Sequence, residues 1–176
     1  MDKILRGRAW KFGDNVDTDV ITPMDVYMSS VLGDANAQRI MKEGAFRNVR
    51  DEFYKVVKKG DIIVAGRNFG CGSHRESANV VLRLLGFSAL VAKSISRIFW
   101  RNSIAIGFPS LQAPGVTRMV EEGDELEIDL RSWKLKNLSS GKEIPIQPYT
   151  ELMQKILEGG GILKLLKQRV QAEKAR

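Results

Sequence analysis

The stretch GDIIVAGRNFGCGSHRES (residues 60–77) joins a short apolar run to a glycine-rich turn, and its pattern decides the fold class. Residues 61–65 have the length and the apolar character of a buried strand. The turn that follows contains three glycines, and Ser73 is placed to begin a helix that runs to Leu85 and stops at Gly86. A strand that leads through a glycine-rich turn into a helix is typical of a parallel α/β sheet.

The segments that follow repeat this order. An apolar run at 89–92 predicts a second strand, residues 96–106 a second helix, and residues 108–111 a third strand. This alternation of strands and helices predicts a parallel core with right-handed crossovers. Further elements are expected as strands at 4–12, 126–130 and 133–138, as a polar loop at 13–22, and as helices at 35–43, 49–58, 150–158 and 162–172.

Length and composition limit the class of protein. The chain has 176 residues, 43% of them hydrophobic and 28% charged, which is typical of one globular domain spanning 1–176. No run is apolar enough for a membrane helix, and the charged start MDKILRGRAW does not resemble a secretory signal, so a cytoplasmic location is expected. Cys71 is the only cysteine, which excludes a disulfide framework or a multi-cysteine metal site made by this chain alone.

The formal net charge of +7 raises the alternative of a protein that binds nucleic acid or another anion. Over half of that surplus lies between Lys155 and Arg176, where there are six Lys and Arg residues and two Glu residues. No aromatic residue follows Tyr149, whereas nucleic-acid-binding surfaces interleave aromatic with basic side chains. A solvated basic C-terminal helix, at about 162–176, is therefore the favoured interpretation, and no nucleic-acid partner is expected.

The turn that leads to Ser73 has the features of an anion site. In an open α/β sheet, ligands bind beyond the carboxyl ends of the strands. A helix that begins at Ser73 would offer free N–H groups and its positive dipole end, and Arg75 would add a planar fork for a carboxylate. Ser73 and Glu76 also fit a capping box, in which the serine hydroxyl accepts from the N–H of Glu76. This structural interpretation is left open beside a catalytic one.

Several other motifs are excluded at this turn. Adjacent residues on a helix point about 100° apart, so His74 is badly placed to act as a base for Ser73. The segment matches neither the G-x-S-x-G nucleophile elbow nor the G-x-G-x-x-G dinucleotide fingerprint. Cys71 is expected to be a small buried thiol without a reactive role.

A second polar cluster, DNVDTD (residues 14–19), places carboxylates at every second or third position. Calcium loops space their ligands similarly, but this segment lacks the glycine and the glutamate that such a loop requires. We therefore expect no metal site in it. The remaining interpretations are a loop stabilised by Asx-type hydrogen bonds and a segment that contacts a substrate or partner.

Four segments together resemble the swivel domain of the aconitase superfamily, in the free-standing form of the small subunits of 3-isopropylmalate dehydratase and homoaconitase. The matching segments are GRAWKFGDNVDTDVITP (7–23), GDIIVAGRNFGCGSHRES (60–77), AKSISRIFWRNSIAIGFP (92–109) and EGGGILKLLKQ (158–168). They cover the chain nearly end to end in the family's order. The resemblance implies a swivelling β/β/α domain and a large partner subunit that carries a [4Fe–4S] cluster, so this chain is expected to bind no metal or cofactor itself.

The resemblance also implies roles for individual residues. Ser73 matches the catalytic base, which as an alkoxide removes the proton α to a carboxylate, and Arg75 matches the arginine that binds a substrate carboxylate. His74 departs from the family pattern, because many relatives have a second serine at this position and a bulky imidazole beside the base would alter hydrogen bonding to the substrate. The further residues expected to contact the substrate are Gly72, His74, Asp17, Thr18 and Asp19.

A substrate-specificity loop follows the DTD segment in the family, and here it comprises Val26, Tyr27, Met28, Ser29 and Ser30. Homoaconitases resemble one another in placing an arginine there, at about the position of Ser29, to pair with an extra substrate carboxylate. This sequence has no Lys or Arg between Lys11 and Arg39, so a second carboxylate arm would lie unpaired. An isopropyl group would instead gain free energy by packing on the apolar side chains of the loop.

The expected activity is therefore that of a 3-isopropylmalate dehydratase small subunit, which with its large subunit interconverts 2- and 3-isopropylmalate through isopropylmaleate in leucine biosynthesis. Homoaconitase and 2-methylmalate or 2,3-dimethylmalate dehydratase are the related hydro-lyases left open. A non-enzymatic anion-binding or nucleic-acid-binding domain is the alternative from another class. The expected partners are the large subunit and a small dicarboxylate, with a homo-oligomer of the chain left open and no membrane partner.

Overall fold

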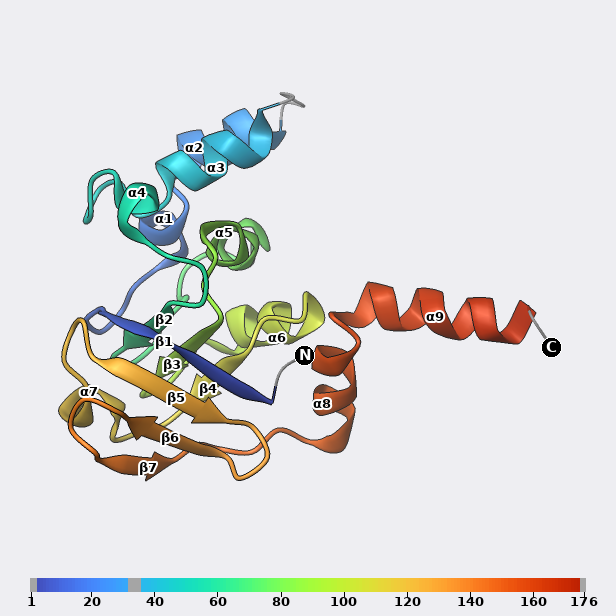
Figure 1. The fold of residues 1–176 in the computed structure, drawn as a ribbon. Coiled ribbons are helices and arrows are strands. Elements are labelled where there is room, and N and C mark those ends of the chain that lie inside the picture. The colour runs from blue at the N-terminus through green and yellow to red at the C-terminus, as the bar shows by residue number, and fades with distance from the viewer. Residues whose placement is uncertain (1–2, 32–35, 175–176) are drawn as a thin grey trace.

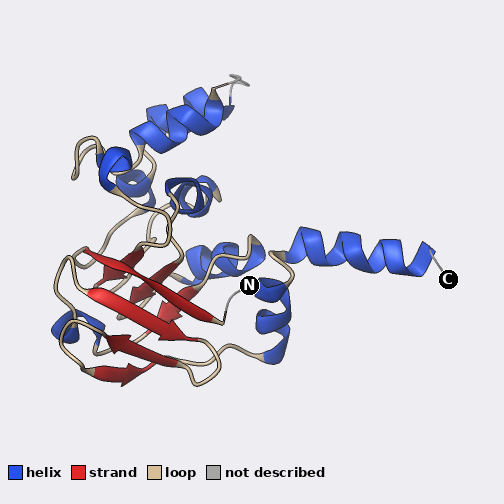
Figure 2. Cartoon of the chain, viewed as in Figure 1, coloured by secondary structure: helices blue, strands red, loops and turns tan. Residues whose placement is uncertain are grey.

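The computed structural model describes residues 3–31 and 36–174, and its strands form one seven-stranded mixed sheet (Figure 1; Figure 2). The strand order across the sheet is β4-β3-β2-β1-β5-β6-β7. The strands are β1 (Ile4–Lys11), β2 (Ile62–Ala65), β3 (Ala89–Ala92), β4 (Ser110–Gln112), β5 (Glu125–Asp129), β6 (Lys134–Asn137) and β7 (Glu143–Pro145).

The helices pack around this sheet. A lobe of α1 to α4 stands above the strands, and α5 lies between that lobe and the sheet (Figure 1). The helices are α1 (Thr18–Ile21), α2 (Met24–Val31), α3 (Ala37–Gly44), α4 (Phe53–Val56), α5 (Ser77–Leu85), α6 (Arg97–Ala105), α7 (Val116–Met119), α8 (Glu151–Glu158) and α9 (Ile162–Lys174).

Strand β1 is shared by the two halves of the sheet. It pairs in parallel with β2, where Ala9 lies opposite Ile62, and antiparallel with β5, where Leu5 lies opposite Ile128. Strands β2, β3 and β4 continue in parallel through the crossover helices α5 and α6, whereas β6 and β7 extend the antiparallel half. The α/β class and the strand–helix–strand order predicted from the sequence are confirmed.

Two apolar cores lie on the two faces of the sheet. Successive side chains of a strand point to opposite faces, so Ile63 packs with Phe53 and Phe69 under the helical lobe. Ile62 packs on the other face with Leu126 of β5. Because β2 is buried on both faces along its whole length, its sequence is a continuous apolar run.

Two elements of the lobe differ from the expectation. The polar segment 13–22 contains the short helix α1, because the side chain of Asp17 caps it by accepting from the N–H groups of Asp19 and Val20. The expected specificity loop is also helical. It forms most of α2, which begins directly after Pro23, a residue that favours the start of a helix.

Other boundaries differ as well. The prediction of a helix over 49–58 is wrong for most of its length, because Glu52 has a left-handed backbone and only α4 is helical. The helix after the glycine-rich turn begins at Ser77 rather than at Ser73. Strand β7 and helix α7 were not expected, and Ala35, where a helix was expected to start, lies outside the described residues.

Helix α9 projects away from the body of the molecule (Figure 1). It is the basic C-terminal helix expected from the sequence and is observed as far as Lys174, since residues 175–176 lie outside the described part of the chain. Among the helices described, none combines the length and the apolar character that crossing a membrane requires.

Candidate active site

The predicted site residues come together where β1 and β2 end. Asp17 and Cys71 form an isolated parallel bridge, and the N–H of Thr18 donates to the carbonyl of Cys71 at 2.9 Å. Phe69 forms a second bridge with Ile95, which follows β3. The loops that follow β1, β2 and β3 therefore lie side by side in the order of their strands. They lie beyond the carboxyl edge of the sheet, where open α/β sheets bind their ligands.

Two glycines let these loops approach closely. Gly70 has a φ of +72°, and a Cβ atom there would lie 2.2 Å from Cγ of Phe99 in α6. Gly72 has a φ of +93°, and a Cβ atom there would lie 3.1 Å from Oγ1 of Thr18. Both positions need a left-handed backbone that glycine adopts without strain, so the glycine-rich turn fixes the position of Ser73.

Ser73 is held by two hydrogen bonds at the end of this turn. Its N–H donates to Oγ1 of Thr18 at 2.9 Å, and its Oγ accepts from the N–H of Arg75 at 3.3 Å. The predicted capping box is wrong, because the serine hydroxyl bonds to Arg75 instead of Glu76 and α5 begins only at Ser77. A serine that accepts from the N–H two residues later forms a local turn, and such turns compete with helix formation.

Arg75 is held between α1 and α2. Its Nη2 forms an ion pair with Asp19, its Nη1 contacts Sδ of Met24 at 3.0 Å, and its guanidinium stacks 4.8 Å from the ring centre of Tyr27. The side chain of Arg75 is 10% exposed and that of Asp19 is 62% exposed, so the pair opens to solvent on the Asp19 side. Nε of Arg75 is buried and has no hydrogen-bond partner among the described residues. The arginine fork is thus fixed in orientation before any ligand arrives.

The three residues of the DTD segment are used differently. Oδ1 of Asp17 accepts from two N–H groups of α1 at 2.8 Å, so this carboxylate caps the helix. Thr18 is buried and supports Ser73, and Asp19 pairs with Arg75. Asp19 is the member of the segment that presents a carboxylate to solvent beside Arg75. Direct contact of these three residues with a substrate stays a prediction.

One face of α2 is turned toward Arg75. Tyr27 and Met28 follow Met24 at the spacing of three and four residues that places side chains on one helix face. Met24 and Tyr27 contact Arg75, and Met28 is exposed. The surface that α2 offers beside the guanidinium is therefore apolar and aromatic.

The remaining predicted specificity residues lie elsewhere on α2. Val26 is buried against Gly44 of α3, and a Cβ atom added to that glycine would lie 2.4 Å from Cγ2 of Val26. Val26 therefore packs α2 against α3 and does not face Arg75. Ser29 lines a small hollow on the α3 side, next to Arg47. The side chain of Ser30 lies outside the described part of the chain.

His74 and Cys71 flank the site. The backbone carbonyl of His74 accepts from Nδ2 of Asn102 at 3.1 Å, which ties the turn to α6, while the histidine side chain is exposed. Cys71 is half-buried, so the expected buried thiol is exposed in part. Burial and the nearby charge of Asp17 raise the pKa of the Cys71 thiol, which favours its protonated, less reactive form.

The residues of this chain do not fit a metal cluster. Within residues 3–31 and 36–174, no group of three or more His, Cys, Asp or Glu side chains is arranged to hold a metal ion. A [4Fe–4S] cluster takes several cysteine thiolates, and the sequence has one cysteine. Any cluster in an assembled enzyme would have to be held by another chain.

Sequence reasoning missed two residues that shape the site, Met24 and Asn102. Pro23 at the start of a segment with apolar residues at positions 24, 27 and 28 was a signal for an amphipathic helix with Met24 on its apolar face. Asn102 gave no such signal, because its contact with the carbonyl of His74 joins residues 28 positions apart.

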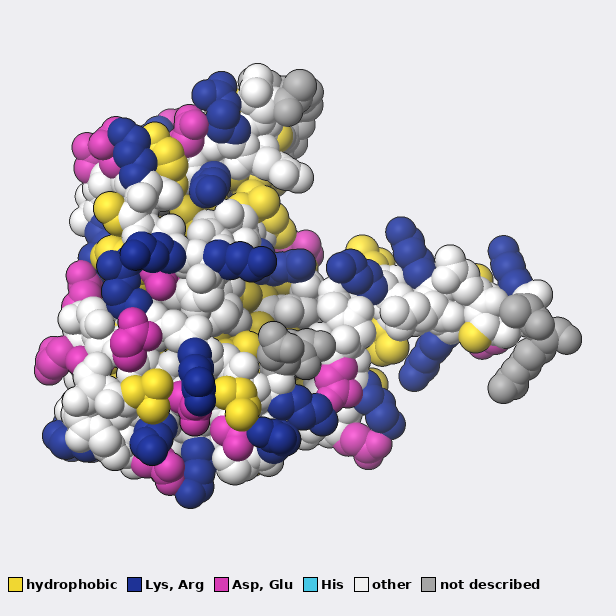
Figure 3. Space-filling view, in the orientation of Figure 1, with side chains coloured by type: hydrophobic (Ala, Val, Ile, Leu, Met, Phe, Trp, Pro, Cys, Tyr) yellow, Lys and Arg dark blue, Asp and Glu magenta, His cyan; other side chains and the backbone are white. Residues whose placement is uncertain are grey.

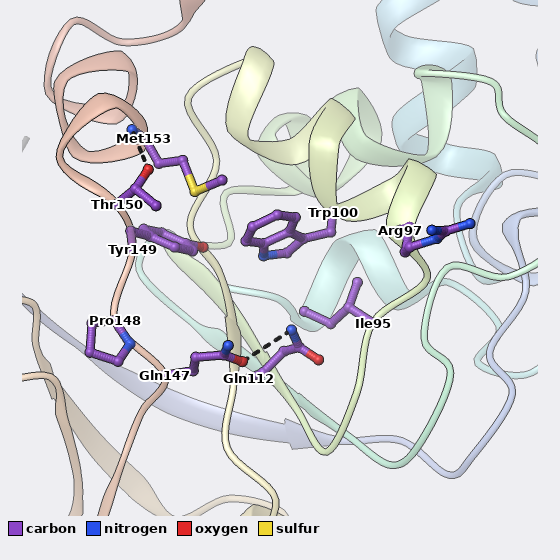
Figure 4. A pocket seen from close by; sticks show the side chains of 9 residues that line it. All are labelled: Ile95, Arg97, Trp100, Gln112, Gln147, Pro148, Tyr149, Thr150 and Met153. Atoms are coloured by element: carbon purple, nitrogen blue, oxygen red, sulfur yellow. Dashed lines mark hydrogen bonds between the residues drawn. The ribbon is translucent and has the colours of Figure 1, made fainter.

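A separate hollow of about 320 Å³ lies between α6 and the segment that enters α8 (Figure 4). The rings of Trp100 and Tyr149 stand in its wall with centres 6.0 Å apart, and Gln112 donates to Gln147 at 3.4 Å. None of the residues expected to contact a substrate lines this hollow. It is therefore distinct from the Ser73 site.

Comparison with known proteins places these features in a family. Residues 15–114, which include the loops after β1 and β2, match the family model of the aconitase C-terminal domain. The chain is 49% identical over 163 residues to the methanogen homoaconitase small subunit of Methanothermobacter thermautotrophicus, covering 93% of this chain and 91% of that one. It is 44% identical to the isopropylmalate/citramalate isomerase small subunit of Methanocaldococcus jannaschii, covering 97% and 98% of the two chains.

Two further proteins show the same relation. The chain is 42% identical to a 3-isopropylmalate dehydratase small subunit of Methanopyrus kandleri, covering 96% of this chain and 95% of that one. It superimposes on the crystal structure of 3-isopropylmalate dehydratase from Methanocaldococcus jannaschii with a TM-score of 0.86 at 37% identity, covering 97% and 99% of the two chains. The chain therefore belongs to the aconitase C-terminal (swivel) domain family, together with the small subunits of 3-isopropylmalate dehydratase and its related isomerases.

Proposed function

We propose that this hydro-lyase small subunit serves a 3-isopropylmalate dehydratase, which interconverts 2- and 3-isopropylmalate through isopropylmaleate. The arrangement around Arg75 supports this most directly. The guanidinium of Arg75, which suits a carboxylate, lies against Met24 and Tyr27. The backbone N–H of the same residue donates to Oγ of Ser73 at 3.3 Å. A single charged contact beside an apolar wall suits a malate-type acid that carries an alkyl substituent.

Ser73 acts as the base in this proposal. In dehydration its oxygen takes the proton from the carbon next to a carboxylate, the electron pair of that C–H bond forms the double bond, and a hydroxyl leaves from the adjacent carbon. A serine is a weak base unless its anion is stabilised. The N–H of Arg75 already points at Oγ, but the positive end of α5 lies further away than the sequence suggested, because that helix begins at Ser77.

Arg75 binds a carboxylate of the substrate. A guanidinium has five N–H donors, and the contacts with Asp19 and Met24 engage one nitrogen each. The carboxylate enters from the Asp19 side, because that side of the ion pair is open to solvent. Asp19 is then a positioning residue, which orients the fork and keeps its charge balanced when the site is empty.

Helix α2 selects the second substituent. It carries no Lys or Arg, and Arg47, a cation near it, pairs with Asp25 on the face away from Arg75. A second carboxylate arm would lie unpaired beside Met24 and Tyr27, at a desolvation penalty of several kcal/mol. An isopropyl group in the same place gains about 0.8 kcal/mol for each CH₂ it buries.

Catalysis also requires a large subunit. The relatives that are named small subunits imply such a partner, and the resemblance implies that it carries a [4Fe–4S] cluster. That cluster would supply the Lewis acid for the departing hydroxyl. This chain supplies the proton transfer at Ser73 and the carboxylate contact at Arg75.

Homoaconitase is the second candidate function. The 49% identity to a methanogen homoaconitase small subunit favours it. In that enzyme class an extra carboxylate must be paired, and α2 offers no cation to pair it. A homoaconitase role would therefore require a cation from the large subunit, and the two candidates differ in which unsaturated acid the complex hydrates.

The proposed role of Ser73 is tested in the complex with the large subunit, reconstituted anaerobically. We expect Ser73→Ala to lower kcat for isopropylmaleate hydration at least about a hundredfold with little change in KM, since it removes the base and leaves Arg75 in place. Ser77→Ala is the matched control, because that hydroxyl lies four residues away and has no hydrogen-bond partner in the described structure. Turnover retained by Ser73→Ala would remove the serine from this role.

A further inference from the structure

Helix α9 leaves the body of the molecule without burying any of its own residues. It has 13 residues and projects away from the sheet (Figure 1). Leu163, Leu166 and Val170 are exposed, Leu163 to 71%, and their spacing of three and four residues places them on one face. Helices of this length are marginal when isolated in water, so a projecting helix with an apolar stripe gains stability by packing against a partner.

The apolar stripe begins beside the candidate active site. Leu163 lines a hollow of about 270 Å³ at the base of α9, together with Ile106 and Glu76. Glu76 is the N-cap residue of α5 and lies three residues after Ser73. A partner that covers the Ser73 turn therefore reaches the base of α9 as well.

The same helix is strongly basic. The helix has four cationic side chains and one carboxylate, that of Glu173. None of the four cations forms an ion pair within the described ranges. The cations are Lys164, Lys167, Arg169 and Lys174. In the helical projection Lys167 lies at one edge of the apolar stripe and Arg169 at the other, so the stripe is bordered by positive charge. The complementary surface is apolar with carboxylates at its border.

The positive charge continues along a neighbouring groove of about 590 Å³. Arg83 lines both this groove and the hollow at the base of α9, and Lys42 and Lys59 also line the groove. These three cations have no carboxylate partner among the residues described. Figure 3 shows Lys and Arg side chains in a row across the molecule at this level, between the helical lobe and the sheet.

We propose that α9 is a docking arm for the large subunit, which binds the Leu163–Leu166–Val170 stripe with an apolar surface bordered by carboxylates. This inference rests on the proposed function, because it takes the partner to be the subunit that completes the Ser73 site. The groove beside α9 extends the contact through its cations. Docking of this arm brings the two subunits together over the Ser73 turn.

The charges and the stripe favour this occupant over others. In a pair of α9 helices from two copies of the chain, four cations on each helix would face four on the other, with one carboxylate on each side. Like charges that face each other across an interface oppose pairing. A nucleic acid would neutralise the cations but would leave the three apolar side chains exposed to water.

The inference is tested by measuring the Kd between the full-length chain and the large subunit of the same organism by isothermal titration calorimetry. We expect Leu166→Glu to weaken binding about tenfold or more, because it puts a charge into an apolar contact, and Lys167→Glu to weaken it and to reduce its salt dependence. Gln168→Glu is the matched control, since it adds the same charge on the opposite face of α9. At saturating concentrations of the large subunit, kcat should be unchanged in all three variants.

Several outcomes would overturn the inference. Equal Kd values for Leu166→Glu and the wild type would show that α9 does not dock. A dimer of the chain alone in sedimentation equilibrium, abolished by Leu166→Glu, would show that the occupant is a second copy. The proposed function is judged separately, because a wild-type complex that binds normally but hydrates no malate-type precursor would refute the function and leave the docking arm supported. Circular dichroism of each variant checks that its helix content is retained.

Discussion

Replacing Thr18 by Val tests whether a buried threonine holds Ser73 in its position. Thr18 is 2% exposed, and its Oγ1 accepts from the N–H of Ser73 at 2.9 Å. Valine keeps the branched shape but cannot accept, so the N–H of Ser73 loses its partner. The bond is part-buried, so its loss costs about 1 kcal/mol, the lower end of the range of about 1–3 kcal/mol for a buried unpaired donor. We expect the free energy of unfolding to fall by about that amount.

Thr22 provides the matched comparison. It lies at the other end of α1, is 1% exposed, and its Oγ1 has no hydrogen-bond partner in the described structure. Thr22→Val removes an unpaired buried hydroxyl, so we expect its stability to equal or exceed that of the wild type. Both variants replace a buried threonine hydroxyl by a methyl group, one at the first residue of α1 and one at its C-cap, and only the hydroxyl of Thr18 accepts the hydrogen bond from Ser73.

Urea unfolding of the isolated chain, followed by circular dichroism, gives the two free energies. The complex with the large subunit gives the functional effect, and we expect kcat/KM to fall for Thr18→Val and to be retained for Thr22→Val, because Thr18 positions Ser73. Equal stability and equal kcat/KM for the two variants would refute the reasoning that the Thr18 hydroxyl orients the base.

Three other changes give independent checks. Arg75→Lys replaces a stacked fork by a point charge, so KM should rise more than kcat falls in steady-state kinetics, and unchanged kinetics would argue against carboxylate binding. Tyr149→Phe removes a hydroxyl that accepts from the N–H of Ser110 at 2.9 Å and donates to its carbonyl at 2.6 Å, so urea unfolding should show a loss of about 1–3 kcal/mol. The side-chain hydrogen bond from Arg50 lowers the pKa of Glu122, so that pair stabilises the fold above the ordinary carboxyl pKa of 4.5 and stops doing so as the pH falls through the lowered value. Glu122→Gln should therefore show a smaller loss of stability than the wild type between neutral and acid pH, and identical acid profiles would contradict this.

The parallel core was predictable from the sequence because its signals are local. The apolar runs at 62–65 and 89–92 are bounded by glycines and polar residues, and each strand is buried on both faces. The glycine-rich turn was also readable, since Gly70 and Gly72 have left-handed backbones that their neighbours require. These features depend on residues close together in the chain.

The geometry around Ser73 was not predictable in the same way. A capping box and a two-residue serine turn use the same side chain, and the N–H of Ser73 that a capping box would give to Glu76 is donated instead to Thr18, 55 residues away. The ion pair between Arg75 and Asp19 joins residues 56 positions apart. The sequence analysis predicted that Arg75 and Asp19 each contact the substrate, whereas in the structure the two side chains form an ion pair with each other. Which faces of α2 meet the site likewise follows only from the packing of Val26 against Gly44.

The most direct test of the proposed function compares two substrates in one preparation. The chain is reconstituted anaerobically with its large subunit, and hydration of isopropylmaleate and of cis-homoaconitate is measured side by side. Because Met24 and Tyr27 border Arg75 and α2 carries no cation, we predict that isopropylmaleate is hydrated with the higher kcat/KM. Preference for cis-homoaconitate would contradict the selection by α2, and hydration of neither acid would contradict the proposed function itself.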